Sequence, residues 1–355
     1  KHNCIECGLC EKVCPVLNPK EEKELEIEAF AVKNTEESQR KNSSSGGVFI
    51  ALANQVIEEG GVVCGAKFDK DFHLIHDFAQ TKEELKPLMG SKYLQSDMKD
   101  CYKKVKNYLL QERLVLFVGT PCQVMGLKLY LRKEYNNLLA IEVVCHGVPS
   151  PLVWEKYLEE VCKRKKISLN EIENISFRNK DKSWRVFNLK IEGKDKTILK
   201  ESLHDNLYMR GFLQNLFLRQ SCHNCPAKNF NSMADISLAD YWSIDRFHPE
   251  IDDNKGVSAM ILYNKKIKLD FKKLLLDLKK LKLDFKNTTL RNILETNTAL
   301  VKSAKPHPKR EEFFDTMQEK GLLNLKQYVG EPTLKKIKRK TRWFLSDVKA
   351  LIIKK

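Results

Sequence analysis

Short apolar runs alternate with segments of helical periodicity along roughly the first 150 residues. Three short, mainly apolar runs are typical of strands: Val62–Phe68, Leu114–Val118 and Leu138–Val144. Helical spacing of apolar residues marks four further segments: 48–59, 81–89, 99–111 and 123–133. Gly60 and Gly61 provide a C-terminal end for the first of these helices. Because strands and helices alternate, this part of the chain is predicted to be an α/β core domain.

The pattern changes after Pro149 and Pro151, where strands and helices no longer alternate regularly. The expected strands are Glu173–Arg178, Val186–Ile191 and Asp235–Ala239. The expected helices are 152–163, 205–218, 265–283 and 310–320. This half is therefore predicted to be an α+β C-terminal region. A small ferredoxin-like segment at 1–20 and an acidic stretch at 21–37, interpreted as a linker, precede the core domain.

The composition is that of a globular chain with a strongly positive charge. Of 355 residues, 42% are hydrophobic and 31% are charged, and the formal net charge is +16. No apolar run is long enough to span a bilayer. Few aromatic residues stand among the lysines, so the charge is attributed to solvated helix faces and not to nucleic-acid binding. The basic amphipathic tail at 331–355 could lie on an anionic membrane surface, but a core-packing helix is favoured.

Four cysteines near the N-terminus have the spacing of an iron–sulfur motif. Cys4, Cys7, Cys10 and Cys14, followed by Pro15, form the C-x2-C-x2-C-x3-C-P run of bacterial ferredoxins. In that run the first three thiolates bind one 4Fe–4S cluster, and the fourth binds the other cluster where there are two. A zinc knuckle or a disulfide pair is the alternative. Eleven cysteines in a basic chain without a visible secretory signal indicate metal ligands and a reducing cytoplasm.

A second set of cysteines is distributed over three loops. Cys122 and Cys145 each follow the carboxyl end of a predicted strand, where open α/β sheets bind ligands. Cys222 and Cys225 form a C-x2-C pair in a polar loop. The four could hold a second 4Fe–4S cluster; alternatively the first two are structural thiols, Cys122 is a nucleophile, or the pair binds zinc. Three other cysteines are interpreted as ordinary core or surface thiols: Cys64, Cys101 and Cys162.

Two polar loops could contact phosphate or a flavin ring. The Ser43–Gly47 loop opens a predicted helix, so its backbone N–H groups could bind phosphate, although most such loops only cap a helix. Lys92, in the loop Gly90–Ser96, could reach a pyrophosphate or a flavin ring, but an ordinary solvated loop is the simpler interpretation.

Several polar residues near these motifs have two interpretations. His146 and His223 flank candidate ligands and could tune or protonate a site, but loop histidines with satisfied hydrogen bonds are favoured. Arg178, Trp184 and Arg185 could contact an acidic substrate, but strand capping is slightly favoured.

Seven stretches together give the chain a family resemblance. They are SSSGGVF (43–49), GSKYLQS (90–96), GTPCQVMGLK (119–128), CHGVPSP (145–151), SFRNKDKSW (176–184), MRGFLQNLFLRQSCHNC (209–225) and DISLADYW (235–242). In this order they resemble the coenzyme F420 hydrogenase/dehydrogenase beta-subunit family, in bacterial members with a ferredoxin-like front end. Such members usually carry two ferredoxin motifs. This chain has one and begins at Lys1, so an upstream half is expected to be missing.

The resemblance implies an FAD-binding iron–sulfur oxidoreductase that passes electrons between a hydride carrier and one or two 4Fe–4S clusters. It implies a redox partner protein or subunit, but it assigns no catalytic residue, and coenzyme F420 is not carried over as the substrate. The alternative is a non-catalytic electron-transfer subunit without flavin. The implied divisions are a ferredoxin-type segment at 1–20, a flavin- and cluster-binding N-terminal domain at 38–150, a C-terminal domain at 151–330 and the tail at 331–355.

The resemblance also assigns residues to the cofactors. The inner-cluster ligands would be Cys122, Cys145, Cys222 and Cys225, beside Cys4, Cys7, Cys10 and Cys14 of the N-terminal motif. The candidate flavin contacts are Ser44, Ser45, Gly46, Gly47, Ser91, Lys92, Gln95, Gly119 and Thr120.

Overall fold

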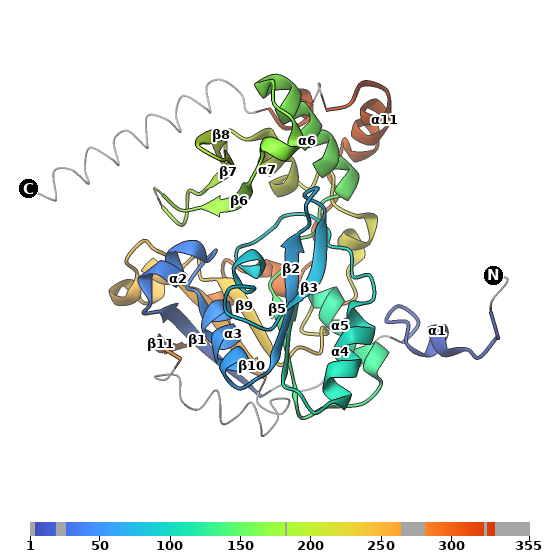
Figure 1. Cartoon of the computed structure of the whole chain (residues 1–355), viewed down its shortest axis with the longest axis vertical. Helices are drawn as coiled ribbons and strands as arrows, with labels where there is room; N and C mark the ends of the chain where they lie inside the picture. The colour runs from blue at the N-terminus through green and yellow to red at the C-terminus, as the bar shows by residue number, and fades with distance from the viewer. Residues whose placement is uncertain (1–3, 19–25, 182, 264–280, 323–324, 331–355) are drawn as a thin grey trace, which may run out of the picture.

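The computed structural model describes residues 4–18, 26–181, 183–263, 281–322 and 325–330 (Figure 1). Eight of the strands form a large sheet: β1 (Ile27–Asn34), β2 (Val62–Phe68), β3 (Leu74–Ala79), β4 (Val115–Gly119), β5 (Leu138–Val143), β9 (Ile236–Asp240), β10 (Ser258–Tyr263) and β11 (Leu283–Thr288). Their spatial order is β11-β1-β10-β9-β5-β4-β2-β3. The central strands β2, β4, β5 and β9 are parallel, and the outer strands pair antiparallel.

Helices cover both faces of the parallel part of this sheet. Helix α3 (Val48–Glu58) lies on one face, and helices α4 (Cys101–Leu110) and α5 (Pro121–Leu131) lie on the other. Successive side chains of a strand point to opposite faces. Leu116 of β4 accordingly packs in the core under α3, while its neighbour Phe117 packs under α4 and α5. The strands in the middle are thus buried on both sides, which explains their continuous apolar sequences.

A second, smaller sheet is formed by β6 (Asn174–Asn179), β7 (Asn188–Gly193) and β8 (Lys196–Ser202), in that order. It packs with α6 (Pro151–Lys165), α7 (Leu207–Leu213), α11 (Arg310–Lys320) and α12 (Leu325–Val329) around an aromatic core. Trp154, Phe177 and Tyr208 are almost completely buried in this core, with ring centroids 5.0–6.0 Å apart. The chain leaves the large sheet after β5 and returns at β9, its neighbour in that sheet, so residues 144–235 form an insertion.

Short elements connect these units. They are α1 (Leu9–Lys12), α2 (Glu37–Asn42), α8 (Ile244–Phe247), α10 (Leu290–Leu294), η1 (Lys86–Leu88), η2 (Leu169–Glu171), η3 (Gln220–Asn224), η4 (Pro249–Ile251) and η5 (Thr298–Leu300). In the described part of the chain no helix has both the length and the apolar character needed to cross a bilayer.

The predicted α/β core and α+β region are confirmed, and two local predictions are wrong. The supposed linker at 21–37 contains β1, a strand of the large sheet that pairs with β10 and β11. The segment 81–89 is not an α-helix; it holds turns and the single 3-10 turn η1, which contains Pro87. Most of the helix expected at 265–283, and the tail at 331–355, lie outside the described residues.

Candidate cofactor cavity and cysteine cluster

A cavity of about 580 Å³ opens at the carboxyl ends of the central parallel strands. Gly119 and Thr120 follow β4 along its wall, and Cys145 follows β5. The insertion supplies the opposite wall, including Phe187 and Phe212. This is the edge at which open α/β sheets bind their ligands.

The structure brings most of the candidate flavin contacts to this cavity. Those that line it are Ser44, Ser45, Gly47, Ser91, Lys92, Gly119 and Thr120. The other two, Gly46 and Gln95, are not part of its lining. A Cβ atom on Gly46 would lie 2.3 Å from the carbonyl oxygen of Val32, so this position requires glycine for packing. The backbone N–H of Gln95 is used in a hydrogen bond to Pro149.

The N-terminus of α3 faces the cavity with its amide groups uncapped. Gly47 precedes the helix in the left-handed region (φ 80°), and no side chain accepts a hydrogen bond from the first turn. Val48 and Phe49 of that turn line the cavity. Free N–H groups and the positive end of an eleven-residue helix favour an anion such as phosphate.

A serine pair extends this polar corner. The Ser44 hydroxyl accepts hydrogen bonds from the backbone N–H (2.6 Å) and the hydroxyl (2.8 Å) of Ser91. Since Ser44 accepts both bonds, its own proton can be donated to a ligand in the cavity.

The N-terminus of α5 differs from that of α3 because its own side chains cap it. The Gln123 side chain accepts a hydrogen bond from the backbone N–H of Thr120 (2.9 Å), and Thr120 caps the helix in return. This box places Cys122 in the first turn, with its sulfur 3.3 Å from the Thr120 hydroxyl. The first turn of α5 is therefore suited to presenting a thiol, and the first turn of α3 to binding an anion.

A buried histidine that was not predicted supports this capping box. His76 Nε2 donates to the carbonyl of Val118 (3.1 Å), since a carbonyl can only accept, and Nδ1 therefore accepts from the Ser96 hydroxyl (2.8 Å). Ser96 in turn accepts from the Gln123 amide (2.7 Å). Burial lowers the pKa of His76 to about 4, which keeps the ring neutral. His76 belongs to no sequence motif, so its contact with the capping box could be found only from its position in β3.

Arg178 holds the Ser43–Gly47 loop against the insertion. Its buried guanidinium forms an ion pair with Asp240 (2.9 Å) and donates to the Ser44 carbonyl (3.1 Å). It also lies 4.1 Å from the ring centroid of Phe187. Both Arg178 and Asp240 line the cavity. Arg178 thus links β6, β9 and the Ser43–Gly47 loop. This is a structural role, of the same kind as the strand capping that the sequence favours.

The remaining residues of that polar stretch are paired. The Trp184 ring stacks on Trp242 with centroids 5.1 Å apart. Arg185, at the cavity wall, forms ion pairs with Asp245 (3.3 Å) and Asp252 (2.8 Å).

Lys92 lines the cavity, but its ammonium group is bound by backbone carbonyls. Nζ donates to the carbonyls of Ala66, Pro87 and Met89 at 2.7–2.9 Å, which uses all three of its protons. Burial lowers the pKa of Lys92 to about 7. Its three carbonyl partners can only accept hydrogen bonds, so the arrangement suits the charged ammonium group. In this arrangement Lys92 contributes positive charge to the cavity wall and has no proton left for a phosphate oxygen.

The four candidate inner-cluster cysteines converge beside the cavity from α5, the end of β5 and η3. Burial raises the pKa of Cys145 to about 12, and the neighbouring Cys122 and Cys222 raise it further. Burial also raises the pKa of Cys222 and Cys225, and Cys122 contributes to both rises. These mutual effects place the four thiols in one neighbourhood, where a bound metal would be needed to keep Cys145, Cys222 and Cys225 ionised.

The spacing of the thiols differs from that of a zinc site. A zinc tetrahedron with Zn–S bonds of about 2.3 Å sets its sulfur atoms roughly 3.8 Å apart. Among the described residues, three ligand atoms lie within 4.8 Å of one another in the turn that contains Asp69, Asp71 and His73. The four cysteines do not form such a group. No three of the four sulfur atoms therefore lie as close together as the ligands of a bound zinc ion.

A buried lysine accompanies these thiols and was also not predicted. Lys228 Nζ donates to the carbonyls of Cys145 (2.6 Å) and Ala299 (2.5 Å). Its charge lowers the pKa of Cys145, Cys222 and Cys225 against the effect of burial. Lys228 follows the C-x2-C pair by three residues, and nothing in the sequence distinguishes it from a surface lysine.

The two histidines beside the ligands differ in their hydrogen bonds. His146 Nε2 lies 2.6 Å from the Asn215 amide oxygen, and burial lowers its pKa, as expected of a loop histidine with a partner. His223 Nδ1 donates to the Ala304 carbonyl (2.8 Å). Among the described residues its buried Nε2 has no hydrogen-bond partner, so the prediction for His223 holds for one nitrogen only.

The N-terminal cysteines lie on a separate, exposed segment. Cys4, Cys7 and Cys10 are exposed and Cys14 is half-buried. The short helix α1 begins after Gly8, which has a φ of 66°, and none of its residues is buried. This segment lies beside α5 (Figure 1).

Of the cysteines outside the two sets, Cys64 and Cys101 are core residues. Their sulfur atoms are 3.0 Å apart, and burial raises the pKa of Cys64 well above its usual value. Cys162 is half-buried on α6.

Comparison with known proteins gives a consistent result. Residues 29–102 match the family model for the N-terminal part of the coenzyme F420 hydrogenase/dehydrogenase beta subunit, and residues 112–284 match the model for its C terminus. No curated protein matches the chain. A solved structure of the F420-reducing NiFe hydrogenase complex from Methanosarcina barkeri contains a similar chain, with 16% sequence identity and a TM-score of 0.51. The alignment covers 82% of this chain and 91% of that chain, and at this identity it shows a similar fold.

Proposed function

Because the chain belongs to the coenzyme F420 hydrogenase/dehydrogenase beta-subunit family and is an oxidoreductase of that type, we propose that it is an iron–sulfur flavoprotein. In this proposal it passes electrons between a hydride carrier and 4Fe–4S clusters, with FAD in the cavity. When bound, FAD can exchange a hydride with one partner and single electrons with another. The identity of the hydride carrier is left open.

The chain's own residues fit a bound dinucleotide. The cavity of about 580 Å³ falls within the usual range for cofactor sites, roughly 300–1,000 Å³. The uncapped turn of α3 and the spare proton of Ser44 provide donors for a pyrophosphate. Phe187 and Phe212 provide apolar surface along the remainder of the wall.

The observation that carries the proposal is the position of Cys145. This residue both lines the cavity and belongs to the four-thiol group with Cys122, Cys222 and Cys225. A cluster held by these thiolates would adjoin the cofactor. Lys228 would stabilise its more negative, reduced form, and the Thr120–Gln123 capping box would hold the Cys122 thiolate in place.

The N-terminal segment is proposed as the electron entry or exit. Helix α5 carries Cys122 at its start and Arg132, beside that segment, at its end. Ten residues of helix span about 15 Å, so α5 places Cys122 about that far from Arg132, which adjoins the N-terminal segment. We propose the division into segment, flavin- and cluster-binding domain, C-terminal domain and tail for the sequence only, because β9, β10 and β11 of residues 151–330 complete the large sheet of the preceding domain. A cytoplasmic location fits the eleven free cysteines.

The first test is the iron, sulfide and flavin content after anaerobic purification, together with the visible spectrum. The flavoprotein hypothesis expects flavin and about four or eight iron atoms per chain. Iron without flavin would favour the second candidate, an electron-transfer subunit without its own active site.

A variant pair tests the inner-cluster ligands. Cys122→Ala is expected to lose about four iron atoms per chain with an unchanged circular dichroism spectrum. Cys162→Ala, at a half-buried cysteine outside both sets, is the matched control and should keep its iron. Unchanged iron content in Cys122→Ala would remove Cys122 from the ligand set.

A further inference from the structure

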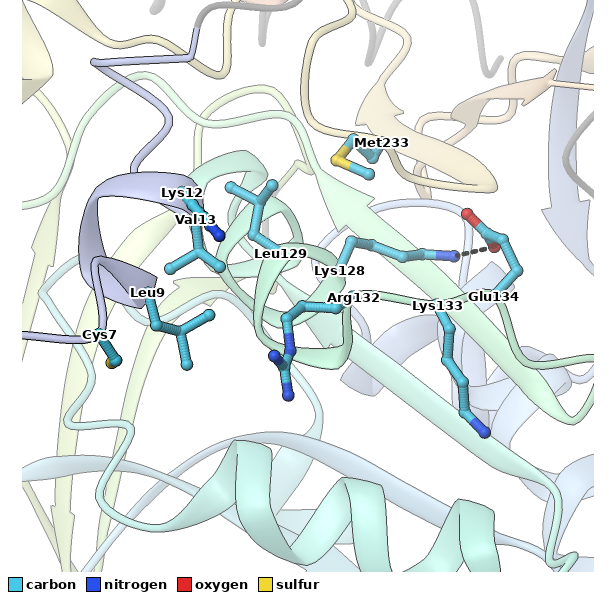
Figure 2. A pocket seen from close by; sticks show the side chains of 10 residues that line it. All are labelled: Cys7, Leu9, Lys12, Val13, Lys128, Leu129, Arg132, Lys133, Glu134 and Met233. Carbon is cyan, nitrogen blue, oxygen red and sulfur yellow. Dashed lines mark ion pairs between the residues drawn. The ribbon is translucent and has the colours of Figure 1, made fainter.

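A groove of about 620 Å³ separates the N-terminal segment from the end of α5 (Figure 2). Cys7, Leu9 and Val13 line it on the segment side. Leu129 and Met233 add apolar surface on the other side. An exposed cysteine of the ferredoxin-type motif therefore lies at the wall of a partly apolar groove.

The groove is strongly basic. Its lining holds four basic side chains, Lys12, Lys128, Arg132 and Lys133, and the single acidic side chain Glu134. Lys128 is buried and forms ion pairs with Asp235 (3.4 Å) and Glu134 (3.7 Å), so those two carboxylates are already engaged. Lys12, Arg132 and Lys133 are exposed, and none has an ion pair with another described residue. The Lys133 ammonium lies 4.6 Å from the centroid of the Tyr135 ring, a contact that leaves its charge without a carboxylate partner. The three charges are therefore available to an acidic protein.

Exposed apolar side chains surround the same motif. Ile5 is 84% exposed, Val16 72% and Leu17 63%. A contact surface with apolar side chains and unpaired charges of one sign is complementary to a protein of opposite charge. It is a poor match for a nucleic acid, because no exposed aromatic side chain of the groove offers a stacking surface.

We propose that this groove is the docking surface for a small, acidic, one-electron carrier protein of the ferredoxin type. The inference deepens the proposed function, since it names the partner chemistry of the N-terminal iron–sulfur site. Each encounter would move one electron from the reduced carrier to this chain, with no bond formed or broken and no proton transferred. Positive charge around Cys7 would steer the carrier so that its own cluster approaches that thiolate.

Zero-length carbodiimide cross-linking of the purified full chain with a small acidic ferredoxin tests the docking surface directly. This reagent joins lysine amines to partner carboxylates. Mass spectrometry should locate the cross-links at Lys12 and Lys133, and their yield should fall as salt is raised. Cross-links concentrated instead on the exposed lysines of α6 would overturn the proposal, as would binding to anionic vesicles without any ferredoxin cross-link.

A pair of charge-reversal variants tests the steering. The double variant Arg132→Glu/Lys133→Glu should reduce the association rate with reduced ferredoxin at least tenfold at low ionic strength, and should weaken its salt dependence. The control is Lys165→Glu/Lys166→Glu at the end of α6. It reverses the same number of charges and also includes a helix C-cap with positive φ (59° at Arg132, 56° at Lys166). The control rate should stay within about twofold of the original.

The outcomes separate docking from electron transfer. Equal slowing in both double variants would mean that only the overall charge matters, and the groove would be rejected. Specific cross-links at the groove without electron transfer would support the docking surface while counting against the proposed iron–sulfur function. Iron content measured in each variant shows whether the clusters are intact.

Discussion

Asp240→Asn should destabilise the protein by removing the charge that compensates Arg178. The Arg178 side chain is 3% exposed and that of Asp240 is 19% exposed. Two hydrogen bonds, of 2.9 and 3.1 Å, join the guanidinium to the two carboxylate oxygens. In the variant, a buried cation would face a neutral amide.

The magnitude follows from this burial. Breaking a buried ion pair by removing one partner costs about 3–5 kcal/mol, because the remaining charge stays desolvated. Asp240 retains some contact with solvent and asparagine keeps one acceptor, so about 3 kcal/mol is expected. Arg178 also anchors the Ser44 carbonyl, so the variant should retain less flavin than the original protein.

Urea unfolding followed by tryptophan fluorescence, with flavin content measured on the same preparations, provides the assay. Asp245→Asn is the control, since Asp245 is 58% exposed and Arg185 keeps its second partner, Asp252. An exposed pair contributes less than about 1 kcal/mol. If Asp240→Asn cost no more than this control, the role assigned to Arg178 as a buried link would be refuted.

Three further changes test other parts of the site. Lys228→Gln should lower the midpoint potential of the inner cluster by on the order of 60 mV, the one-electron equivalent of about 1.4 kcal/mol, while Lys228→Arg changes it less; redox titration followed by electron paramagnetic resonance measures this. His76 has a folded pKa of about 4 against 6.5 unfolded, so its contribution to stability is complete above pH 6.5 and falls as the pH drops toward 4. At pH 5 the free energy of unfolding is expected to be about 2 kcal/mol lower on this account. Urea titrations at pH 7.5 and 5 measure that decrease, which should be smaller in His76→Gln than in the original protein. Gly46→Ala would place a Cβ 2.3 Å from a strand carbonyl and should abolish soluble expression or cost more than about 2 kcal/mol, whereas Gly90→Ala, with φ 78° and open space, should cost about 1 kcal/mol.

The sequence predicts those elements whose burial is set locally. Val62–Phe68 is a strand with the predicted bounds, because its first four residues are apolar or small and are buried on both faces. Helix α3 begins at the predicted Val48, since its apolar stripe and the glycines before and after it agree. Strand β1 is not predicted from the sequence, which suggests a linker there. Acidic residues precede this strand, and its pairing partners lie more than 200 residues away. No local pattern reports such a pairing.

The same limit applies to the site. Cysteine spacing and strand ends indicate Cys122, Cys145, Cys222 and Cys225 as a group, and the structure places them in one neighbourhood. The Ser43–Gly47 loop could be recognised from its composition. Arg178 fixes this loop from 134 residues away, whereas its sequence context suggests only a strand cap or a substrate contact. His76 and Lys228 derive their roles from buried contacts that sequence spacing does not encode.

The insertion leaves the large sheet at β5 and returns at the adjacent strand β9. Cys145 stands just after its exit, and Cys222 and Cys225 stand shortly before its return. Metal ligation at these three positions would close the insertion into a covalent ring through iron, as a disulfide closes a loop. Such a ring would cross-link the insertion at its base, beside the Arg178–Asp240 ion pair that already joins it to the large sheet. Iron loss would accordingly remove the cross-link and leave the packing between the two units in place.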